Sequence, residues 1–248
     1  MNIKKLNWAG LQLDCGDKTL LIDAVENFTG YYPVLGHPLT PLIYFSDDVK
    51  ADYILVTHLH RDHFDPAVLA KCLKPGGKVF ISKKPEQQVR ALSPEFSFLE
   101  TDELFSDGAI TIKAVYSLDG IGEEQTAWIV SYKDITIFHG GDTIWHNQFW
   151  KTGKENPGID FAFLPINGVV VNFEMIGLQF STVPASMTPE QAFNAAKLLR
   201  AAYLIPIHYG KFASALYQPC DTSEQVLQAY STLLEQPFQL LNDGDMLR

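Results

Sequence analysis

The feature that most constrains this chain is a cluster of histidines near residue 60. Three of the seven histidines fall within six residues, in the segment His58-Leu59-His60-Arg61-Asp62-His63. Ordinary packing does not require three imidazoles and a carboxylate on one short turn. A divalent metal does, because neutral imidazole and carboxylate are ligands for zinc, manganese and iron. The segment therefore predicts a metal site.

The residues before the cluster predict how two of its histidines are placed. Residues 51–56 contain the apolar run Tyr53-Ile54-Leu55-Val56 and predict a buried strand. Alternate residues of an extended segment point to the same side. His58 and His60 can therefore bind one metal while Leu59 faces the core.

The residues after the cluster predict a helix. Asp65 and Pro66 read as an N-cap and a first helical residue, so we expect a helix over residues 66–73. Asp62 and His63 then lie in a tight connection and can turn toward a second metal position. This strand–loop–helix context favours a metal site over a polar loop that happens to be rich in histidine.

Composition excludes several classes of function. The chain has 248 residues, 46% of them apolar, which is enough for a sizeable core in a single domain over residues 1–248. No apolar run reaches about 18 residues, so we expect no membrane span. The net charge of −10 argues against a nucleic-acid partner, because phosphate contacts require basic surfaces.

The cysteines indicate the compartment. Cys15, Cys72 and Cys220 are odd in number and far apart, which favours buried thiols over a disulfide framework. The first residues are not followed by the apolar core of a signal peptide. We therefore expect a cytoplasmic protein, and leave open whether it forms a homo-oligomer.

Strand and helix patterns alternate along the rest of the chain. After a hairpin that turns at Gly16-Asp17, we expect strands at 19–23, 51–56, 78–82, 110–116, 127–132, 135–138, 159–166, 203–207 and 238–241. We expect helices at 66–73, 85–92, 189–200 and 222–235, the third of them opened by a capping box at Thr188. This pattern predicts an α/β layered sandwich with metal-binding residues along one edge of its sheets.

Two further ligand candidates follow strands. Asp142 lies in Gly140-Gly141-Asp142-Thr143, where the glycines allow a tight turn that aims the carboxylate along the strand axis. His208 ends the apolar segment Leu204-Ile205-Pro206-Ile207. Together with the histidine cluster, both are predicted to be ligands, and Asp142 could bridge two metals.

These pieces resemble the metallo-β-lactamase fold of metal-dependent hydrolases. The matching segments are Leu20-Leu21-Ile22-Asp23, Thr57 to His63, Gly141-Asp142-Thr143 and Pro206-Ile207-His208-Tyr209-Gly210, in the family's order over nearly the whole chain. The segment Met187 to Ala192 followed by Pro-Ile-His-Tyr-Gly is similar to the branch that contains ascorbate-6-phosphate lactonase. The resemblance implies a four-layer αββα sandwich.

The resemblance also implies a ligand set. His58 and His60 would serve the first metal position. Asp62, His63 and His208 would serve the second, with Asp142 between the two. Asp62 and Asp142 are the expected catalytic residues. Asp62 acts either as a ligand, which we favour, or as a base that orients water.

One departure from the family concerns the first metal position. The family normally has a further histidine before the Gly-Asp-Thr hairpin, whereas this chain has Ala114-Val115-Tyr116-Ser117-Leu118-Asp119-Gly120. Either Asp119 or Tyr116 takes its place, or the first position is weak and one metal does the work. The usual histidine near the first hairpin is also absent, since Asn7-Trp8-Ala9-Gly10 stands there.

Other residues are candidates for substrate contact. His146 follows Asp142 closely, and either faces the pocket or packs at the surface. Lys211 either receives a substrate phosphate or carboxylate, or is an ordinary solvated lysine. His139 is expected to be structural. The long aromatic loop over residues 28–45 is either a binding loop or an ordinary surface loop.

A metal with open coordination lowers the pKa of bound water, and the resulting hydroxide attacks an electrophilic centre. We therefore predict a hydrolase that acts on an ester, lactone or phosphoester bond of a small-molecule substrate. It would hold one or two divalent metals per chain, either zinc, manganese or iron. The alternative is a non-hydrolytic metal-binding sensor or redox protein on the same fold. The intact second metal position favours the hydrolase.

Overall fold

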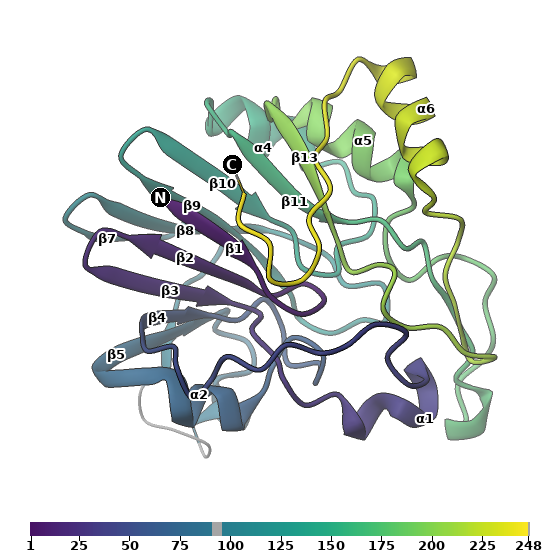
Figure 1. The fold of residues 1–248 in the computed structure, drawn as a ribbon, viewed down its shortest axis with the longest axis horizontal. Helices are drawn as coiled ribbons and strands as arrows, with labels where there is room; N and C mark the ends of the chain where they lie inside the picture. The colour runs from purple at the N-terminus through teal and green to yellow at the C-terminus, as the bar shows by residue number, and fades with distance from the viewer. Residues whose placement is uncertain (91–95, 248) are drawn as a thin grey trace.

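Two six-stranded sheets lie face to face in the computed structural model, which describes residues 1–90 and 96–247 (Figure 1). The first sheet contains, in spatial order, β1 (Asn2–Lys5), β2 (Leu11–Cys15), β3 (Lys18–Ile22), β4 (Ala51–Leu55), β5 (Leu73–Ile81) and β6 (Phe96–Phe98). The second contains β13 (Tyr203–Ile207), β11 (Phe161–Pro165), β10 (Ile135–His139), β9 (Thr126–Tyr132), β8 (Ile110–Tyr116) and β7 (Leu104–Asp107). A small third sheet pairs β12 (Val170–Val171) with β14 (Tyr217–Gln218).

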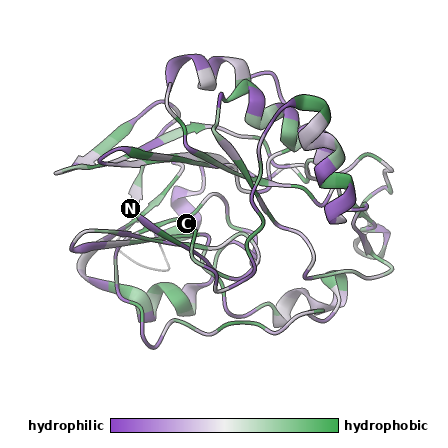
Figure 2. Ribbon diagram, turned by 45° about the horizontal axis from the view of Figure 1, so that its top comes forward, coloured by the Kyte–Doolittle hydropathy of each residue, from purple (hydrophilic) through white to green (hydrophobic). Residues whose placement is uncertain are grey.

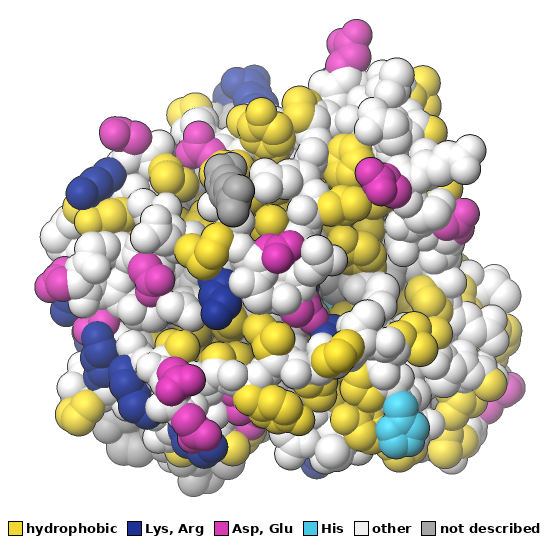
Figure 3. Space-filling model, viewed as in Figure 1, with side chains coloured by type: hydrophobic (Ala, Val, Ile, Leu, Met, Phe, Trp, Pro, Cys, Tyr) yellow, Lys and Arg dark blue, Asp and Glu magenta, His cyan; other side chains and the backbone are white. Residues whose placement is uncertain are grey.

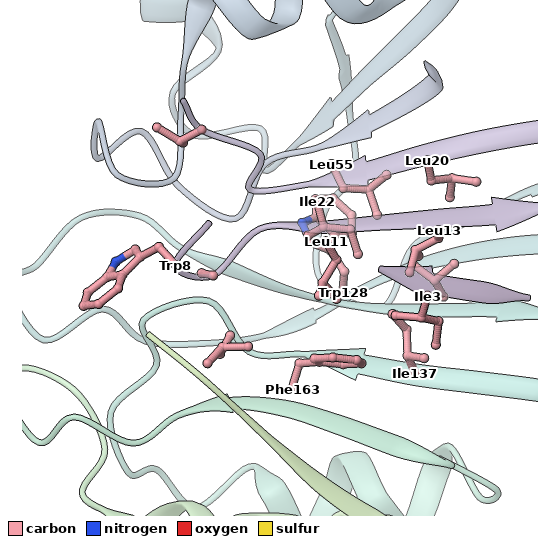
Figure 4. Close-up of a cluster of buried hydrophobic side chains, with 14 of the residues drawn as sticks. Ile3, Trp8, Leu11, Leu13, Leu20, Ile22, Leu55, Trp128, Ile137 and Phe163 are labelled. Carbon is pink, nitrogen blue, oxygen red and sulfur yellow. The ribbon is translucent and has the colours of Figure 1, made fainter. Parts of the chain in front are cut away.

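The space between the two large sheets is filled by apolar side chains from both. The core residues drawn in Figure 4 include Leu13 and Leu20 from the first sheet and Trp128, Ile137 and Phe163 from the second. All five are fully buried. Removing a side chain of this size from water stabilises a fold by roughly 1.5–3 kcal/mol, so this layer contributes much of the driving force for folding.

Helices cover the outer faces of both sheets. On the first sheet, α2 (Pro66–Cys72) packs Val68 and Leu69 against Ile54 of β4. On the second sheet, α5 (Pro189–Leu198) packs Phe193 against Leu164 of β11. The helices α4 (Phe149–Glu155) and α6 (Glu224–Leu234) lie beside α5, and α3 (Glu86–Val89) follows β5. Figure 2 shows hydrophobic and hydrophilic residues on the same helices, as expected for helices with one buried face.

The order of layers is therefore helix, sheet, sheet, helix, which confirms the predicted αββα sandwich. The capping box at Thr188 is confirmed too, since its hydroxyl accepts from Gln191 N. The loop over residues 28–45 holds two short helices, η1 (Thr29–Tyr31) and α1 (Tyr32–Leu35). A third short helix, η2 (Glu174–Ile176), follows β12. In the described part of the chain, none of the helices has the length and apolar character needed to cross a bilayer.

Three details of the predicted elements are wrong. The strand expected at 238–241 is a single bridge between Phe238 and Leu204, because the preceding residue, Pro237, has no N–H to donate to the ladder. The last helix begins at Glu224 with Ser223 at its N-cap and without a side-chain capping bond, so Thr222 is not its cap. The helix expected at 85–92 is only the single turn of α3, and residues 91–92 lie outside the described residues.

The parallel strands bring the predicted ligands to one edge. β3, β4 and β5 run parallel in the first sheet, and β10, β11 and β13 run parallel in the second. The carboxyl ends of parallel strands meet at one edge of a sheet, where ligands bind in many α/β proteins. Asp23 follows β3, the His58 segment follows β4, Asp142 follows β10 and His208 follows β13.

Candidate metal centre

Two groups of metal-binding side chains meet at this edge and share Asp142. In each group, one ligand atom per residue lies within 4.8 Å of every other. The first group is His58, His60, Asp119 and Asp142, and the second is Asp62, His63, Asp142 and His208. The structure thus brings together all six predicted ligands, divided between two positions as the sequence suggests, and adds Asp119.

The second position has the donor atoms that a divalent metal requires. Asp142 Oδ1 lies 2.9 Å from His63 Nε2 and 2.7 Å from His208 Nε2. All three atoms are buried, and none has a hydrogen-bond partner of suitable geometry among the described residues. Asp62 Oδ2 lies 3.4 Å from His208 Nε2. Buried polar atoms are normally paired, so orphaned donors that converge on one point fit a bound cation.

Asp119 is held in place to complete the first position. Its Oδ2 accepts from the backbone N–H of Ile121 at 2.8 Å and of Glu123 at 3.0 Å. Its Oδ1 is buried, lacks a hydrogen-bond partner within the described chain and lies 3.9 Å from His60 Nδ1. His60 Nδ1 in turn lies 2.9 Å from His58 Nε2. One oxygen of Asp119 is thus anchored while the other faces the two histidines.

Tyr116, the other candidate for the missing histidine, lies elsewhere. It ends β8, is 40% exposed and packs edge-on against His146 with ring centroids 5.1 Å apart. The chain then continues for three residues to Asp119, which forms a bridge with Thr143 and so lies beside Asp142. A carboxylate just beyond the strand end therefore occupies the region where the family's histidine is expected.

Asp23 contacts a candidate ligand, although the sequence analysis assigned it no role at the site. Its Oδ2 lies 2.7 Å from His63 Nδ1 and accepts from Thr57 Oγ1 at 2.7 Å, while Oδ1 accepts from Thr57 N at 2.8 Å. A carboxylate on Nδ1 holds the proton there and leaves the Nε2 lone pair for a metal. The sequence feature that could have identified Asp23 is its position directly after a buried strand, in Leu20-Leu21-Ile22-Asp23.

Three more residues orient the ligands. Trp8 Nε1 donates to Asp62 Oδ2 at 3.1 Å, and the indole packs against the His208 ring with centroids 4.1 Å apart. Asn167 Nδ2 lies 3.1 Å from His208 Nδ1. Gln125 Oε1 accepts from Asp142 N at 3.1 Å. Trp8 stands in the segment where the family's first-hairpin histidine is absent, so this region supports the second position without supplying a ligand.

Gly141 is required for Asp142 to reach the centre. Its φ is +61°, and a Cβ there would lie 2.9 Å from Thr57 Cβ. Only glycine combines this conformation with such a close approach at low cost. Gly141 thus has the role in the turn that the sequence predicts.

The pKa shifts in the cluster follow from its crowded, buried charges. Burial lowers the pKa of His58 to about 3, so its imidazole is neutral, which is the form that binds a metal. Asp142 and Asp62 raise the pKa of His63 and of His208 against the effect of burial, so a metal that binds there would displace a proton from each. Burial opposes ionisation of Asp62, but the nearby charges of His63 and His208 outweigh it and lower the pKa to about 2. The pKa of Asp142 is likewise held well below its usual value by His208 and His63, against the effect of burial.

The cavity above the two positions has a volume of about 340 Å³. His60, Asp62, Asp142 and His208 form its floor. The predicted binding loop contributes to its wall through Gly30, Tyr31, Val34 and Leu35. Ligand sites are typically concave and mostly apolar, with a few convergent polar groups, and this cavity has that character.

The structure does not bring the two predicted substrate-binding residues to this cavity. His146 is buried, stacks on Phe149 with ring centroids 3.9 Å apart and is not part of the lining. Lys211 is 3% exposed, forms an ion pair with Asp243 and donates to Pro41 O at 3.0 Å. The long lysine side chain turns inward because the partly buried carboxylate of Asp243 is available to it.

His139 is structural, as expected. Its Nε2 lies 2.8 Å from Ala9 O, and its Nδ1 accepts from Gly141 N at 3.3 Å. Both ring nitrogens are therefore occupied by the backbone, and the residue supports the turn that carries Asp142.

Comparison with known proteins agrees with this geometry. A family model described as a beta-lactamase superfamily domain matches residues 18–209. A UPF0173 metal-dependent hydrolase from Staphylothermus marinus is 31% identical over 216 residues, which are 84% of this chain and 80% of that protein. YtkL from Bacillus subtilis, another UPF0173 metal-dependent hydrolase, is 30% identical over 210 residues, which are 79% of this chain and 84% of that protein.

Solved structures share the fold at lower identity. The isothiocyanate hydrolase from Delia radicum gut bacteria superposes with a TM-score of 0.76 at 21% identity, covering 100% of this chain and 99% of the other. Igni18, a metallo hydrolase from Ignicoccus hospitalis, superposes with a TM-score of 0.73 at 18% identity, covering 99% and 97%. The family match and the two relatives from Staphylothermus marinus and Bacillus subtilis show that the chain belongs to the UPF0173 family of metal-dependent hydrolases in the β-lactamase superfamily.

Proposed function

We propose that this protein hydrolyses an ester, lactone or phosphoester bond of a small molecule at a centre for two divalent cations, either zinc, manganese or iron. One observation carries the proposal: two sets of buried ligand atoms share Asp142 at the floor of one cavity. A shared carboxylate holds two cations at the short separation that two-metal hydrolysis requires.

The side chains have distinct tasks in this proposal. His58, His60 and Asp119 would hold the first cation, and Asp62, His63 and His208 would hold the second. Divalent cations at these positions would supply a bound water of lowered pKa and polarisation of the substrate. Asp62 is ionised and fixed by the Trp8 indole, which favours its role as a ligand over that of a proton carrier.

Two likenesses guide the choice of bonds to test. The resemblance to the branch that contains ascorbate-6-phosphate lactonase is the reason for including lactones. The isothiocyanate hydrolase of similar fold is named for a reaction in which water attacks an electrophilic carbon, so an isothiocyanate belongs in the same panel.

The test combines metal content with a substrate screen. Protein purified without chelator is measured by inductively coupled plasma mass spectrometry and assayed on an aryl ester, a lactone, a phosphodiester and an isothiocyanate. We expect about two metals per chain and turnover of at least one substrate. Activity should vanish with a chelator and return when the metal is restored.

Asp142→Asn should abolish turnover and lower the metal content, because both positions share this carboxylate. Asp14→Asn is the matched control. Asp14 lies on β2, accepts from Thr19 Oγ1 of β3 and is outside the lining of the cavity. Full turnover by the chelated enzyme, or unchanged metal content in Asp142→Asn, would refute the proposed function.

A further inference from the structure

The wall of the cavity differs in character from its floor. Apart from the four metal-binding residues, the lining is mainly aliphatic and aromatic, including Val34, Val169, Val171 and Phe173. Lysine and arginine are absent from the lining formed by the described residues. A substrate in this cavity therefore meets mainly apolar surface away from the metal positions.

The mouth of the cavity is apolar too. Ile121, Met175 and Leu178 all line it and are 44%, 64% and 51% exposed. In Figure 3 apolar side chains gather at the lower right of the face shown, over the region of α1. Large apolar side chains that surround one opening and stay exposed are a surface that an apolar ligand would cover.

The wall offers few polar groups to a substrate. Ser186 Oγ is engaged, because it donates to Asn167 Oδ1. The hydroxyls of Tyr31 and Tyr217 accept from Arg61 N at 3.2 Å and from Asn167 Nδ2 at 2.7 Å, so each keeps its own hydrogen for a substrate oxygen. Two neutral hydroxyls can orient a substrate, but they do not supply the several charge-assisted donors that a phosphate requires.

The net charge at the floor of the cavity also disfavours an anionic substrate. Two divalent cations bring four positive charges, and four buried carboxylates, Asp23, Asp62, Asp119 and Asp142, bring four negative ones. The loaded centre is therefore close to neutral and has no excess charge for an anionic group. The nearby basic side chains do not enter the cavity lining: Lys211 is paired with Asp243, and Arg61 lies exposed beside Gly30 at the rim.

We infer that the substrate is an uncharged molecule with an apolar body of several carbons, seated against Val171, Phe173 and Leu178, with its electrophilic carbon over Asp142. This inference rests on the proposed function, since the same centre performs the hydrolysis. A lactonase for phosphorylated sugars would differ from this protein, because the body of its substrate is charged and hydrophilic.

A homologous ester series tests the inference. The 4-nitrophenyl esters of acetic, butyric and hexanoic acid share one leaving group, and the adipic acid monoester matches hexanoate in length but carries a carboxylate. We expect kcat/KM to rise by up to about fourfold per added methylene, which is the transfer free energy of one buried CH₂. The adipate ester should fall at least about tenfold below hexanoate, because its charge finds no partner in the wall.

A positive charge placed in the wall should weaken the preference for the uncharged ester. Leu178→Lys adds a cation at the mouth, so the ratio of hexanoate to adipate turnover should fall. Leu233→Lys is the matched control, because Leu233 is 74% exposed on α6 and outside the cavity lining. Arg61→Ala should leave the ratio unchanged. The inference would be overturned if the unmodified enzyme turned over the adipate ester in preference to the hexanoate ester and the Arg61→Ala variant lost that preference.

Binding without turnover separates this inference from the proposed function. Hexananilide and its 4-carboxy derivative resist hydrolysis, and their affinities are measured by calorimetry on the metal-loaded protein. We expect the neutral anilide to bind at least about tenfold more tightly. Selective binding of the neutral anilide without turnover of any ester, lactone, phosphodiester or isothiocyanate refutes only the proposed function. Equal or tighter binding of the carboxylate overturns the inference itself.

Discussion

Replacing Asp23 by asparagine should weaken metal binding although Asp23 touches no metal position. The change preserves shape and removes one charge. The oxygen of the new amide is forced to face Thr57 N, because that backbone N–H donates to Oδ1 at 2.8 Å and cannot become an acceptor. The new NH₂ group then occupies the place of Oδ2, next to His63 Nδ1 and Thr57 Oγ1.

This NH₂ group reverses the hydrogen bonds that reach two ligands. It donates to His63 Nδ1, so the His63 proton moves to Nε2, the atom that faces the metal. It also donates to Thr57 Oγ1, whose own hydrogen then turns to His58 Nδ1, 3.0 Å away, and His58 Nε2 is protonated in the same manner. Both metal positions therefore lose a donor through one substitution.

The expected effect is a 10- to 100-fold loss of metal affinity, which is typical when the partner of a ligating histidine is altered. This loss corresponds to roughly 1.4–2.7 kcal/mol. Affinity is measured by competition with a chromophoric chelator at fixed pH. Asp14→Asn is the control, and thermal unfolding with saturating metal confirms that both variants fold. Equal affinities for the Asp23→Asn variant and the unmodified protein would refute the argument.

Three further predictions concern the centre. The double variant His58→Ala/His63→Ala should lose bound metal by elemental analysis, and unchanged content would place the site elsewhere. Asp119→Ala should lower the metal content from about two per chain to about one, whereas two tightly held metals in both proteins would exclude Asp119 as a ligand. Gly141→Ala should cost about 1–3 kcal/mol of stability in chemical denaturation, through strain at positive φ and contact with the Thr57 side chain. Gly108→Ala, at φ +57° with open space around it, should cost less, and equal losses would show that the contact is unimportant.

The local pattern of the chain was enough to predict most of the side chains that meet at the candidate metal centre. The spacing of His58, His60, Asp62 and His63 between a strand and a helix is a property of adjacent residues, so it can be read without knowing the fold. Asp142 and His208 could be added because each directly follows an apolar strand, and parallel strands bring their carboxyl ends to one edge.

Only the tertiary structure could decide the role of Asp119. Its distance from Asp142 depends on the bridge between Asp119 and Thr143, which joins the connection between β8 and β9 to the segment after β10. The sequence left Asp119, Tyr116 and an empty position as alternatives. Backbone hydrogen bonds from Ile121 and Glu123 aim Asp119 at the centre, whereas Tyr116 turns outward to His146.

The direction of long side chains was equally out of reach of the sequence. Lys211 lies three residues after His208, yet its ammonium pairs with Asp243, 32 positions further along the chain, and misses the cavity. His146 also lies outside the cavity lining, because its ring stacks on Phe149.

The sequence by itself determined the alternation of strands and helices, the metal-binding motif and six ligand candidates, because these depend on short-range periodicity and residue chemistry. The tertiary structure alone decided which carboxylate completes the first position, which groups orient the ligands and that the cavity wall is apolar. Each of these depends on contacts between residues far apart in the chain, such as Trp8 with Asp62 and Asp23 with His63, and long-range packing sets those contacts.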